Sequence, residues 1–231
     1  MAHLIWSQVL RGGEDAAIDA TCGNGHDSSF LASLLFRPDT EKTLSELICI
    51  DIQQQACEAT RKRLEASLNP NIMRNNVKIV HESHSNLPRP SSPVGLVCYN
   101  LGYLPKSEDR STFTQMESTV ESIADAALIL RVGGMISVMT YPKSNPCEDY
   151  AVHGILEGMA LLTSRLMDWE DYVNKLGPDP EGPGFTVRNC VRKALNRIKD
   201  GGADEQTWRV MEHKTMGRPL SPILLTATRV K

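Results

Sequence analysis

The sequence predicts an α/β protein with a Rossmann-like fold, in which a mostly parallel, seven-stranded sheet carries helices on both faces. Three observations predict this fold class. Short β-rich runs alternate with helical patterns, which is typical of a parallel sheet covered by helices. A glycine turn follows the first β-rich run, and the last two β-rich runs follow each other without a helical pattern between them.

The first half of the chain predicts four strands and two helices. Four short apolar runs have the length and composition of strands. They are residues 16–20, 47–51, 77–81 and 95–99. Residues 27–36 predict a helix because their apolar side chains lie on one side, and residues 53–68 predict an amphipathic helix.

The middle of the chain predicts one helix and the fifth strand. Apolar residues recur at intervals of three and four from 116 to 130, so this stretch is expected to form a helix with one buried stripe. We expect Gly133 and Gly134 to end that helix. Residues 135–140 then form the fifth strand.

The end of the chain predicts two further strands after an elaborated region. Residues 208–214 and 223–229 are separated by glycine and prolines, which predicts a terminal antiparallel hairpin. The preceding region, about 163–204, contains a loop at 177–184 and a basic helix at 186–199.

Length and composition favour a single domain that spans residues 1–231. The 41% hydrophobic and 23% charged contents are ordinary for a soluble protein. No apolar run approaches the roughly 20 residues that span a bilayer, so no membrane association is expected. Because the net charge is -3, any contact with nucleic acid has to come from a local basic patch.

The six cysteines are scattered and form neither a CxxC pair nor a cluster with histidines, so no metal site is expected. Cys49 and Cys98 lie inside apolar runs, which suits a reducing compartment. The first residues are typical of neither a signal peptide nor a transit peptide. We therefore expect a soluble protein of the cytoplasm, or of the chloroplast or mitochondrion if an upstream transit peptide has been removed.

A glycine turn with neighbouring acids marks the expected ligand edge of the sheet. Ligands of a doubly wound sheet bind beyond the carboxyl ends of the strands, where a glycine turn lets backbone N–H groups approach them. Gly23-Asn-Gly25 lies in the turn after the first strand, which ends at Asp19. Asp51 ends the second strand, where a carboxylate can accept both hydroxyls of a ribose. The alternative is an ordinary tight turn with acids that cap helices.

The turn departs from the pattern of dinucleotide-binding proteins. The third glycine of GxGxxG is replaced by Ser28. Asp19 and Asp27 would repel an anionic pyrophosphate, whereas they would attract the ammonium and the sulfonium of S-adenosylmethionine. The sequence therefore favours S-adenosylmethionine as the cofactor.

Four blocks of the chain carry a resemblance to a known family. They are Asp19-Ala-Thr-Cys-Gly-Asn-Gly-His-Asp27, Asp51-Ile-Gln-Gln-Gln55, His81-Glu-Ser-His-Ser-Asn-Leu87 and Asn100-Leu-Gly-Tyr-Leu-Pro105. Together they resemble the bacterial proteins labelled putative rRNA methylases, from the first residues to Tyr141 and again over the last two strands. The resemblance implies the class I S-adenosylmethionine-dependent methyltransferase fold. It also implies methylation of 5-aminomethyl-2-thiouridine to 5-methylaminomethyl-2-thiouridine at the tRNA wobble position, with the anticodon stem-loop as partner.

The resemblance further implies which residues contact the cofactor. Asn24, Gly25, His26 and Asp27 would hold the methionine part, Asp51 and Gln53 the ribose, and Ser83 and His84 the adenine. The two histidines are also candidates for proton transfer, since imidazole titrates near neutrality. The spacing places neither histidine beside a nucleophile, so contacts with the cofactor are the preferred interpretation.

Two segments depart from the family. Tyr141-Pro-Lys-Ser-Asn-Pro-Cys147 replaces a stretch that is usually rich in histidine and glycine, and the segment 163–204 is longer than in the bacterial relatives. Both departures concern the substrate more than the cofactor. The added length resembles an elaboration of a plant or other eukaryotic homologue.

The block at the end of the fourth strand indicates the acceptor side of a methyl transfer. This reaction is an in-line displacement, so the enzyme mainly has to position a neutral nucleophile. Asn100-Leu-Gly-Tyr103 resembles the Asn-Pro-Pro-Tyr motif of amino-group methyltransferases. Asn100 is thus expected to accept an N–H of the target amine, and Tyr103 to stack on the base. The alternative is a turn with a surface tyrosine.

The basic helix at 186–199 is the candidate RNA contact. Its apolar stripe is Val187, Val191, Ala194, Leu195 and Ile198. Arg188, Arg192 and Lys199 fall within about 40° of one another beside that stripe. They can contact RNA phosphates, or they can form the solvated rim of a packed helix.

Three functions remain open from the sequence. The first is an N-methyltransferase of the tRNA wobble uridine, and the second is a methyltransferase of another amine, in rRNA or in a small metabolite. The third is a nonenzymatic Rossmann-like RNA-binding protein, which binding of the methyl donor would separate from the other two. The sequence also leaves open whether the chain forms a homodimer.

Overall fold

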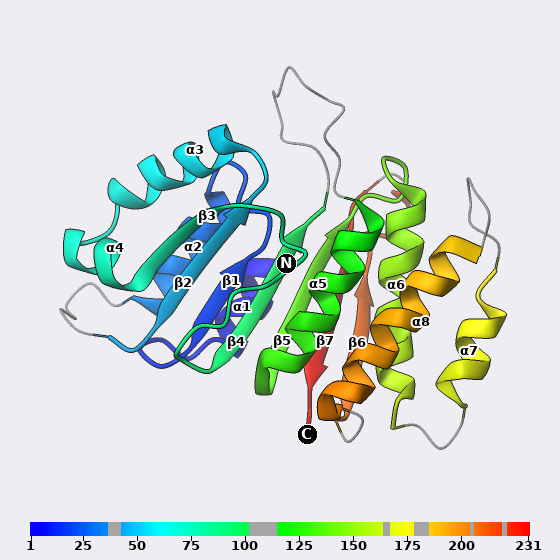
Figure 1. Cartoon of the computed structure of the whole chain (residues 1–231). Coiled ribbons are helices and arrows are strands. Elements are labelled where there is room, and N and C mark those ends of the chain that lie inside the picture. Colours follow the sequence, from blue (N-terminus) through cyan, green and yellow to red (C-terminus); the bar gives the residue numbers. More distant parts are fainter. Residues whose placement is uncertain (37–42, 102–114, 164–166, 178–184, 204–205, 219–220) are drawn as a thin grey trace.

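One sheet forms the centre of the computed structural model of the chain (Figure 1). In the described part of the chain its seven strands are β1 (Ala16–Asp19), β2 (Glu46–Asp51), β3 (Val77–His81), β4 (Val94–Asn100), β5 (Leu130–Thr140), β6 (Trp208–His213) and β7 (Ile223–Arg229). Their order is β3-β2-β1-β4-β5-β7-β6. Strands β1 to β5 are parallel, and β7 is antiparallel to both β5 and β6. The predicted mostly parallel sheet and its terminal antiparallel hairpin are confirmed.

Helices connect and cover these strands. They are α1 (Ala2–Val9), α2 (His26–Leu35), α3 (Gln54–Glu65), α4 (Pro70–Asn76), α5 (Met116–Ile129), α6 (Pro146–Leu161), α7 (Trp169–Lys175), α8 (Phe185–Ile198) and the π-helical turn η1 (Lys199–Ala203). The structure describes residues 1–36, 43–101, 115–163, 167–177, 185–203, 206–218 and 221–231. Within these ranges no helix combines the length and apolar character needed to cross a membrane.

Each face of the sheet has its own core. Trp6 of α1, Leu31 of α2 and Leu64 of α3 belong to one cluster of buried residues, and α5, α6, α7 and α8 contribute to the other. The neighbouring β1 residues Ala17 and Ile18 belong to opposite clusters, because successive side chains of a strand point to opposite faces. Figure 1 shows α5 and α8 in front of the sheet and α1 behind it. The expected helices on both faces are therefore present.

The predicted end of the helix at 116–130 is wrong. Helix α5 ends at Ile129, and Leu130 is already extended, with ψ 136°. Both Gly133 and Gly134 lie inside β5, where the register against β4 shifts. Gly133 has φ +77°, a conformation that costs glycine little, so the pair forms an irregularity within the strand and does not cap the helix.

Several helices had no clear signal in the sequence. Helix α1 buries Trp6, and its Ile5 and Val9 pack against the same cluster. Helix α7 has only seven residues and is held at its start by the Asp168 side chain, which accepts a hydrogen bond from the Glu170 N–H at 2.7 Å. Such short helices depend on packing and caps more than on a periodic pattern.

Candidate functional site

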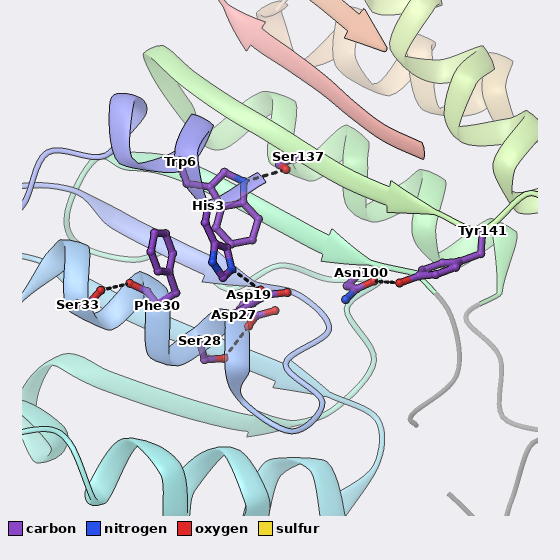
Figure 2. Close-up of polar contacts among 10 residues, drawn as sticks. All are labelled: His3, Trp6, Asp19, Asp27, Ser28, Phe30, Ser33, Asn100, Ser137 and Tyr141. Carbon is purple, nitrogen blue, oxygen red and sulfur yellow. Dashed lines mark hydrogen bonds and ion pairs between the residues drawn. The ribbon is translucent and has the colours of Figure 1, made fainter. Parts of the chain in front are cut away.

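Four parallel strands end at one edge of the sheet and place polar residues there. β1, β2, β4 and β5 end at Asp19, Asp51, Asn100 and Thr140. From β1 the chain continues to β2 on one side of the sheet, whereas β4 and β5 lie on the other side. Ligands of open α/β sheets bind at such a switch point, beyond the carboxyl ends of the strands. Figure 2 shows side chains that converge there from β1, α2 and β4.

The turn between β1 and α2, residues 20–25, packs closely on α3. A Cβ atom at Gly25 would lie 2.8 Å from the Cα of Thr60, and Gly25 has φ +75°. Both facts require glycine at this position. The Thr60 hydroxyl donates to the Gly23 carbonyl at 3.1 Å, which fixes the turn to α3. The predicted glycine turn therefore has the tight geometry that a close ligand contact needs.

Asp19 is buried at the end of β1, with 2% of its surface exposed. Its carboxylate accepts hydrogen bonds from the Ser28 hydroxyl at 2.6 Å and from the Thr21 N–H at 3.4 Å. Burial, together with the negative charges of Asp27 and Asp51, raises the pKa of this carboxyl to about 7, against the opposing effect of the hydrogen bond from Ser28. Asp19 can therefore change its charge near neutral pH.

Asp51 holds the turn from the end of β2. One carboxylate oxygen accepts from the Gly23 N–H and the other from the Gln53 N–H, both at 2.9 Å. Burial raises the pKa of Asp51, and these backbone hydrogen bonds oppose that shift. Gln53 begins α3 as its N-cap. Ile52, between the two residues, is 59% exposed and presents an apolar surface at this edge, a feature without a signal in the sequence.

The predicted methionine-site residues face different neighbours. The Asn24 carbonyl accepts from the Arg63 side chain at 2.8 Å, and the His26 ring lies 3.2 Å from the same guanidinium. Asp27 instead contacts α1, because its carboxylate lies 2.7 Å from Nε2 of His3. The structure therefore places Asp27 near the sheet edge and turns His26 towards α3.

His3 was not recognised in the sequence as a site residue. Its ring stacks on Phe30 with 3.9 Å between the ring centroids, and Trp6 of the same helix donates to the Ser137 hydroxyl of β5 at 2.9 Å. These contacts fix α1 beside Asp27, as Figure 2 shows. The only available signal was the apolar spacing of α1, which indicates packing and not a site.

Ser83 and His84 follow β3 and differ in environment. His84 is 8% exposed and contacts the ring of Tyr99 edge-on, whereas Ser83 is exposed and accepts from the Ser85 N–H at 3.3 Å. Burial lowers the pKa of His84 to about 4, against a hydrogen bond with the Ala20 backbone that raises it. His84 is therefore neutral at neutral pH, which suits a hydrogen-bonding role better than proton transfer.

Asn100 is exposed at the end of β4 and held at two points. Its backbone N–H donates to the Thr21 hydroxyl at 2.7 Å, and its side-chain oxygen accepts from the Tyr141 hydroxyl at 3.0 Å. Neither partner was assigned a role from the sequence. Tyr103, the expected stacking residue, lies outside the described residues.

The three basic residues of the expected RNA helix contact α7 and its surroundings. Arg188 donates to the Leu176 carbonyl at 2.6 Å, and Arg192 to the Asn174 side chain at 2.8 Å. Lys199 lies 5.9 Å from the ring centre of Trp169. The predicted apolar stripe of this helix is buried. The structure thus brings Asp19, Asp51 and Asn100 to one edge of the sheet, and it places the basic residues on α8 and η1.

A family model described as "Putative rRNA methylase" matches residues 47–172 of the chain. A curated relative, the chloroplastic tRNA (mnm(5)s(2)U34)-methyltransferase of Arabidopsis thaliana, is 33% identical over 144 residues. These residues are 61% of this chain and 51% of the relative, so the match spans about half of that protein.

Two solved structures are similar over nearly the whole chain. A putative rRNA-methylase from Clostridium thermocellum has a TM-score of 0.62 and 24% identity, with coverage of 99% of this chain and 95% of that chain. A putative methyltransferase from Streptococcus mutans, in complex with SAH, has a TM-score of 0.58 and 23% identity, with the same two coverages. At these identities the likeness shows a shared fold, and it confirms the predicted Rossmann-like fold of class I methyltransferases.

The raised pKa of Asp19 predicts how the stability of the protein depends on pH. Because the folded-state pKa of about 7 exceeds the ordinary value of 3.8, the folded protein holds this proton more tightly than the unfolded chain. The resulting stabilisation is complete below about pH 4 and is lost as the pH rises towards 7, in total on the order of 4 kcal/mol. Asp19→Asn keeps an acceptor for Ser28 without this titration. The free energy of unfolding of this variant should therefore increase, relative to that of the wild type, as the pH rises.

Urea unfolding between pH 4 and 8 measures this difference. Replacement of an exposed acid, Asp200→Asn, serves as the matched control. If the curves of Asp19→Asn and the wild type stay parallel across this range, the assignment of a titrating buried carboxyl to Asp19 is wrong.

Proposed function

The chain belongs to the putative rRNA methylase family, and from this membership we propose that it is an S-adenosylmethionine-dependent methyltransferase that acts on RNA. One observation carries the proposal. Asp19, Asp51 and Asn100 end neighbouring strands at one sheet edge, which provides acids for the methyl donor beside a carboxamide for the acceptor. More narrowly, we propose that the acceptor is the amine of 5-aminomethyl-2-thiouridine at the tRNA wobble position. The Arabidopsis relative, which is named for this class of wobble uridine, supports that choice.

The residues of the site fit S-adenosylmethionine. A carboxylate offers about four acceptor positions, so the two backbone hydrogen bonds to Asp51 leave acceptors for ribose hydroxyls. Asp19 and Asp27 provide negative charge for the ammonium group of the donor. We propose that Asn24, Gly25, His26, Gln53, Ser83 and His84 complete this site. The neutral, buried His84 suits the adenine, because it can exchange hydrogen bonds without carrying charge.

The acceptor chemistry assigns a simple task to Asn100. When bound, S-adenosylmethionine supplies an electrophilic methyl carbon: the amine lone pair forms the new C–N bond as the C–S bond breaks and its electrons stay on sulfur. Asn100 can accept an N–H of the neutral amine and so aim its lone pair at that carbon. The methylated nitrogen is then a secondary ammonium, which releases its proton to water. We propose that Tyr103 stacks on the uracil ring.

The first prediction from the proposed function concerns the donor site. Asp51→Ala removes the partner of two ribose hydroxyls and should weaken binding by about 1 to 3 kcal/mol, or roughly 5- to 150-fold. Titration calorimetry with S-adenosylhomocysteine measures the affinity, and thermal melting shows whether the variant is folded. Glu58→Ala, which removes an exposed acid of α3, is the matched control and should bind normally. Unchanged affinity in a folded Asp51→Ala protein would contradict the assignment.

The second prediction concerns the chemistry. Asn100→Ala should keep its affinity for the donor but lose on the order of 100-fold in the single-turnover rate, because misplacing the amine by about 1 Å has an effect of this size. Tyr103→Phe should be mild and Tyr103→Ala severe, since stacking requires the ring more than the hydroxyl.

The assay compares tRNA that carries 5-aminomethyl-2-thiouridine with otherwise identical tRNA that lacks the aminomethyl group, and mass spectrometry identifies the product nucleoside. Equal methylation of both tRNAs would overturn the proposed substrate. A near-normal rate for Asn100→Ala would remove this residue from the mechanism.

The third prediction concerns RNA binding by Arg188, Arg192 and Lys199. An arginine has five N–H donors, so the contacts of both arginines with α7 leave donors for phosphate oxygens. We propose that all three residues contact the RNA backbone. Each lost phosphate contact lowers the slope of log K against log salt by about 0.7 to 0.9, so the triple Ala variant should lose roughly 2 to 3 from the slope.

Binding of tRNA at several salt concentrations separates this role from packing. The matched control removes three exposed basic residues of α3 and α4, Arg61, Lys62 and Arg74. If the α8 variant melts at a lower temperature but keeps the wild-type slope, the three residues only hold α7 in place.

A further inference from the structure

We infer that Tyr141 is a positioning residue for the methyl transfer, which orients the Asn100 carboxamide through its hydroxyl. This inference rests on the proposed role of Asn100. Tyr141 follows β5 directly, and its hydroxyl donates to the Asn100 side-chain oxygen at 3.0 Å. Figure 2 shows the two side chains meeting at the sheet edge, on the side of Asn100 away from Asp19 and Asp27.

The backbone of Asn100 is already fixed by the sheet. Its N–H donates to Thr21 of the turn between β1 and α2, and the next N–H, that of Leu101, donates to the Met139 carbonyl at 2.9 Å. These bonds set the distance of the residue from the turn that carries the acids. They do not fix the rotation of its exposed side chain, which the Tyr141 hydroxyl contacts.

The orientation of this carboxamide decides whether it can bind an amine. The oxygen of the group accepts hydrogen bonds, whereas its NH2 donates them and would oppose the N–H groups of a substrate amine. A phenolic hydroxyl donates more strongly than it accepts, because its lone pair is delocalised into the ring. Tyr141 therefore favours the orientation in which it meets the oxygen. A carbonyl oxygen has two lone pairs, so one remains for the substrate.

Tyr141 begins the segment that follows β5, Tyr141-Pro-Lys-Ser-Asn-Pro-Cys147. The same segment leads into α6, whose N-cap is Asn145. Its two ends are thus anchored, one on Asn100 and one on the first turn of a helix. Tyr141 therefore lies between two regular elements, β5 and α6, which restrict its position.

The first test requires no substrate. In nuclear magnetic resonance spectra, the side-chain amide signals of Asn100 are those that disappear in Asn100→Ala. Tyr141→Phe removes only the hydroxyl and should shift these signals. Tyr172→Phe is the matched control, because its hydroxyl bonds to Glu157 at 2.6 Å on the helical layer and should leave them in place. Unmoved Asn100 signals in a folded Tyr141→Phe protein would overturn the inference.

The second test is a double-mutant cycle of single-turnover rates. Tyr141→Phe should slow methyl transfer on the order of 10-fold while the affinity for S-adenosylhomocysteine stays unchanged, because the hydroxyl acts through Asn100. In the Asn100→Ala background the same change should have no further effect. An equal loss in both backgrounds, or no loss in the wild-type background, would contradict the role of Tyr141.

Different results would contradict the proposed tRNA substrate and the proposed role of Tyr141. If the wild type does not methylate tRNA containing 5-aminomethyl-2-thiouridine, the proposed substrate is wrong and the amide signals of Asn100 still test the contact. If the wild type is active and Asn100→Ala is slow, a normal rate for Tyr141→Phe refutes this inference alone.

Discussion

The buried carboxyl of Asp19 links the end of β1 to the first turn of α2 through a hydrogen bond, and the arrangement of the site depends on this bond. The Ser28 hydroxyl reaches Asp19 from α2 at 2.6 Å, across the turn that contains Gly23 and Gly25. An ionisable group without a salt-bridge partner is costly to bury, and Asp19 has no such partner among the described residues, so packing alone does not account for an acid at this position. Its raised pKa and its place at the switch point of the sheet are typical of a functional group.

The places of Asp19, Asp51 and Gly25 in the fold could be predicted because their signals are local. Asp19 and Asp51 each end an apolar run, and Gly25 lies in a turn that no other residue type fits, so short stretches of sequence place all three. The contacts His3–Asp27 and Tyr141–Asn100 join residues that are 24 and 41 positions apart. Because pairs of this kind depend on how helices and strand ends pack together, periodicity along one segment does not reveal them.

The basic helix also combines a feature that the local sequence predicts with contacts that it does not predict. Its apolar spacing correctly predicted that Val187 and Leu195 are buried, because one stripe of a helix has to pack on its neighbours, which here include α5 and α6. The contacts of Arg188 and Arg192 could not be predicted, since they depend on α7, a helix of seven residues in a stretch with no periodic pattern. The position of a charge on a helical wheel therefore does not distinguish packing against a neighbouring helix from contact with phosphate.

A buried polar chain connects the two sides of the site. His84, on the proposed adenine side, lies 3.5 Å from the Thr119 hydroxyl of α5, which donates to the Glu148 carboxylate of α6 at 2.7 Å. The Glu148 N–H in turn donates to the side chain of Asn145, four residues after Tyr141. Such networks are rigid when their groups are satisfied, because each broken hydrogen bond would leave a buried polar atom without a partner. The segment that begins at Tyr141 is therefore linked through Glu148 and Thr119 to His84, so a substitution at either end of this chain of contacts can change the geometry of the other.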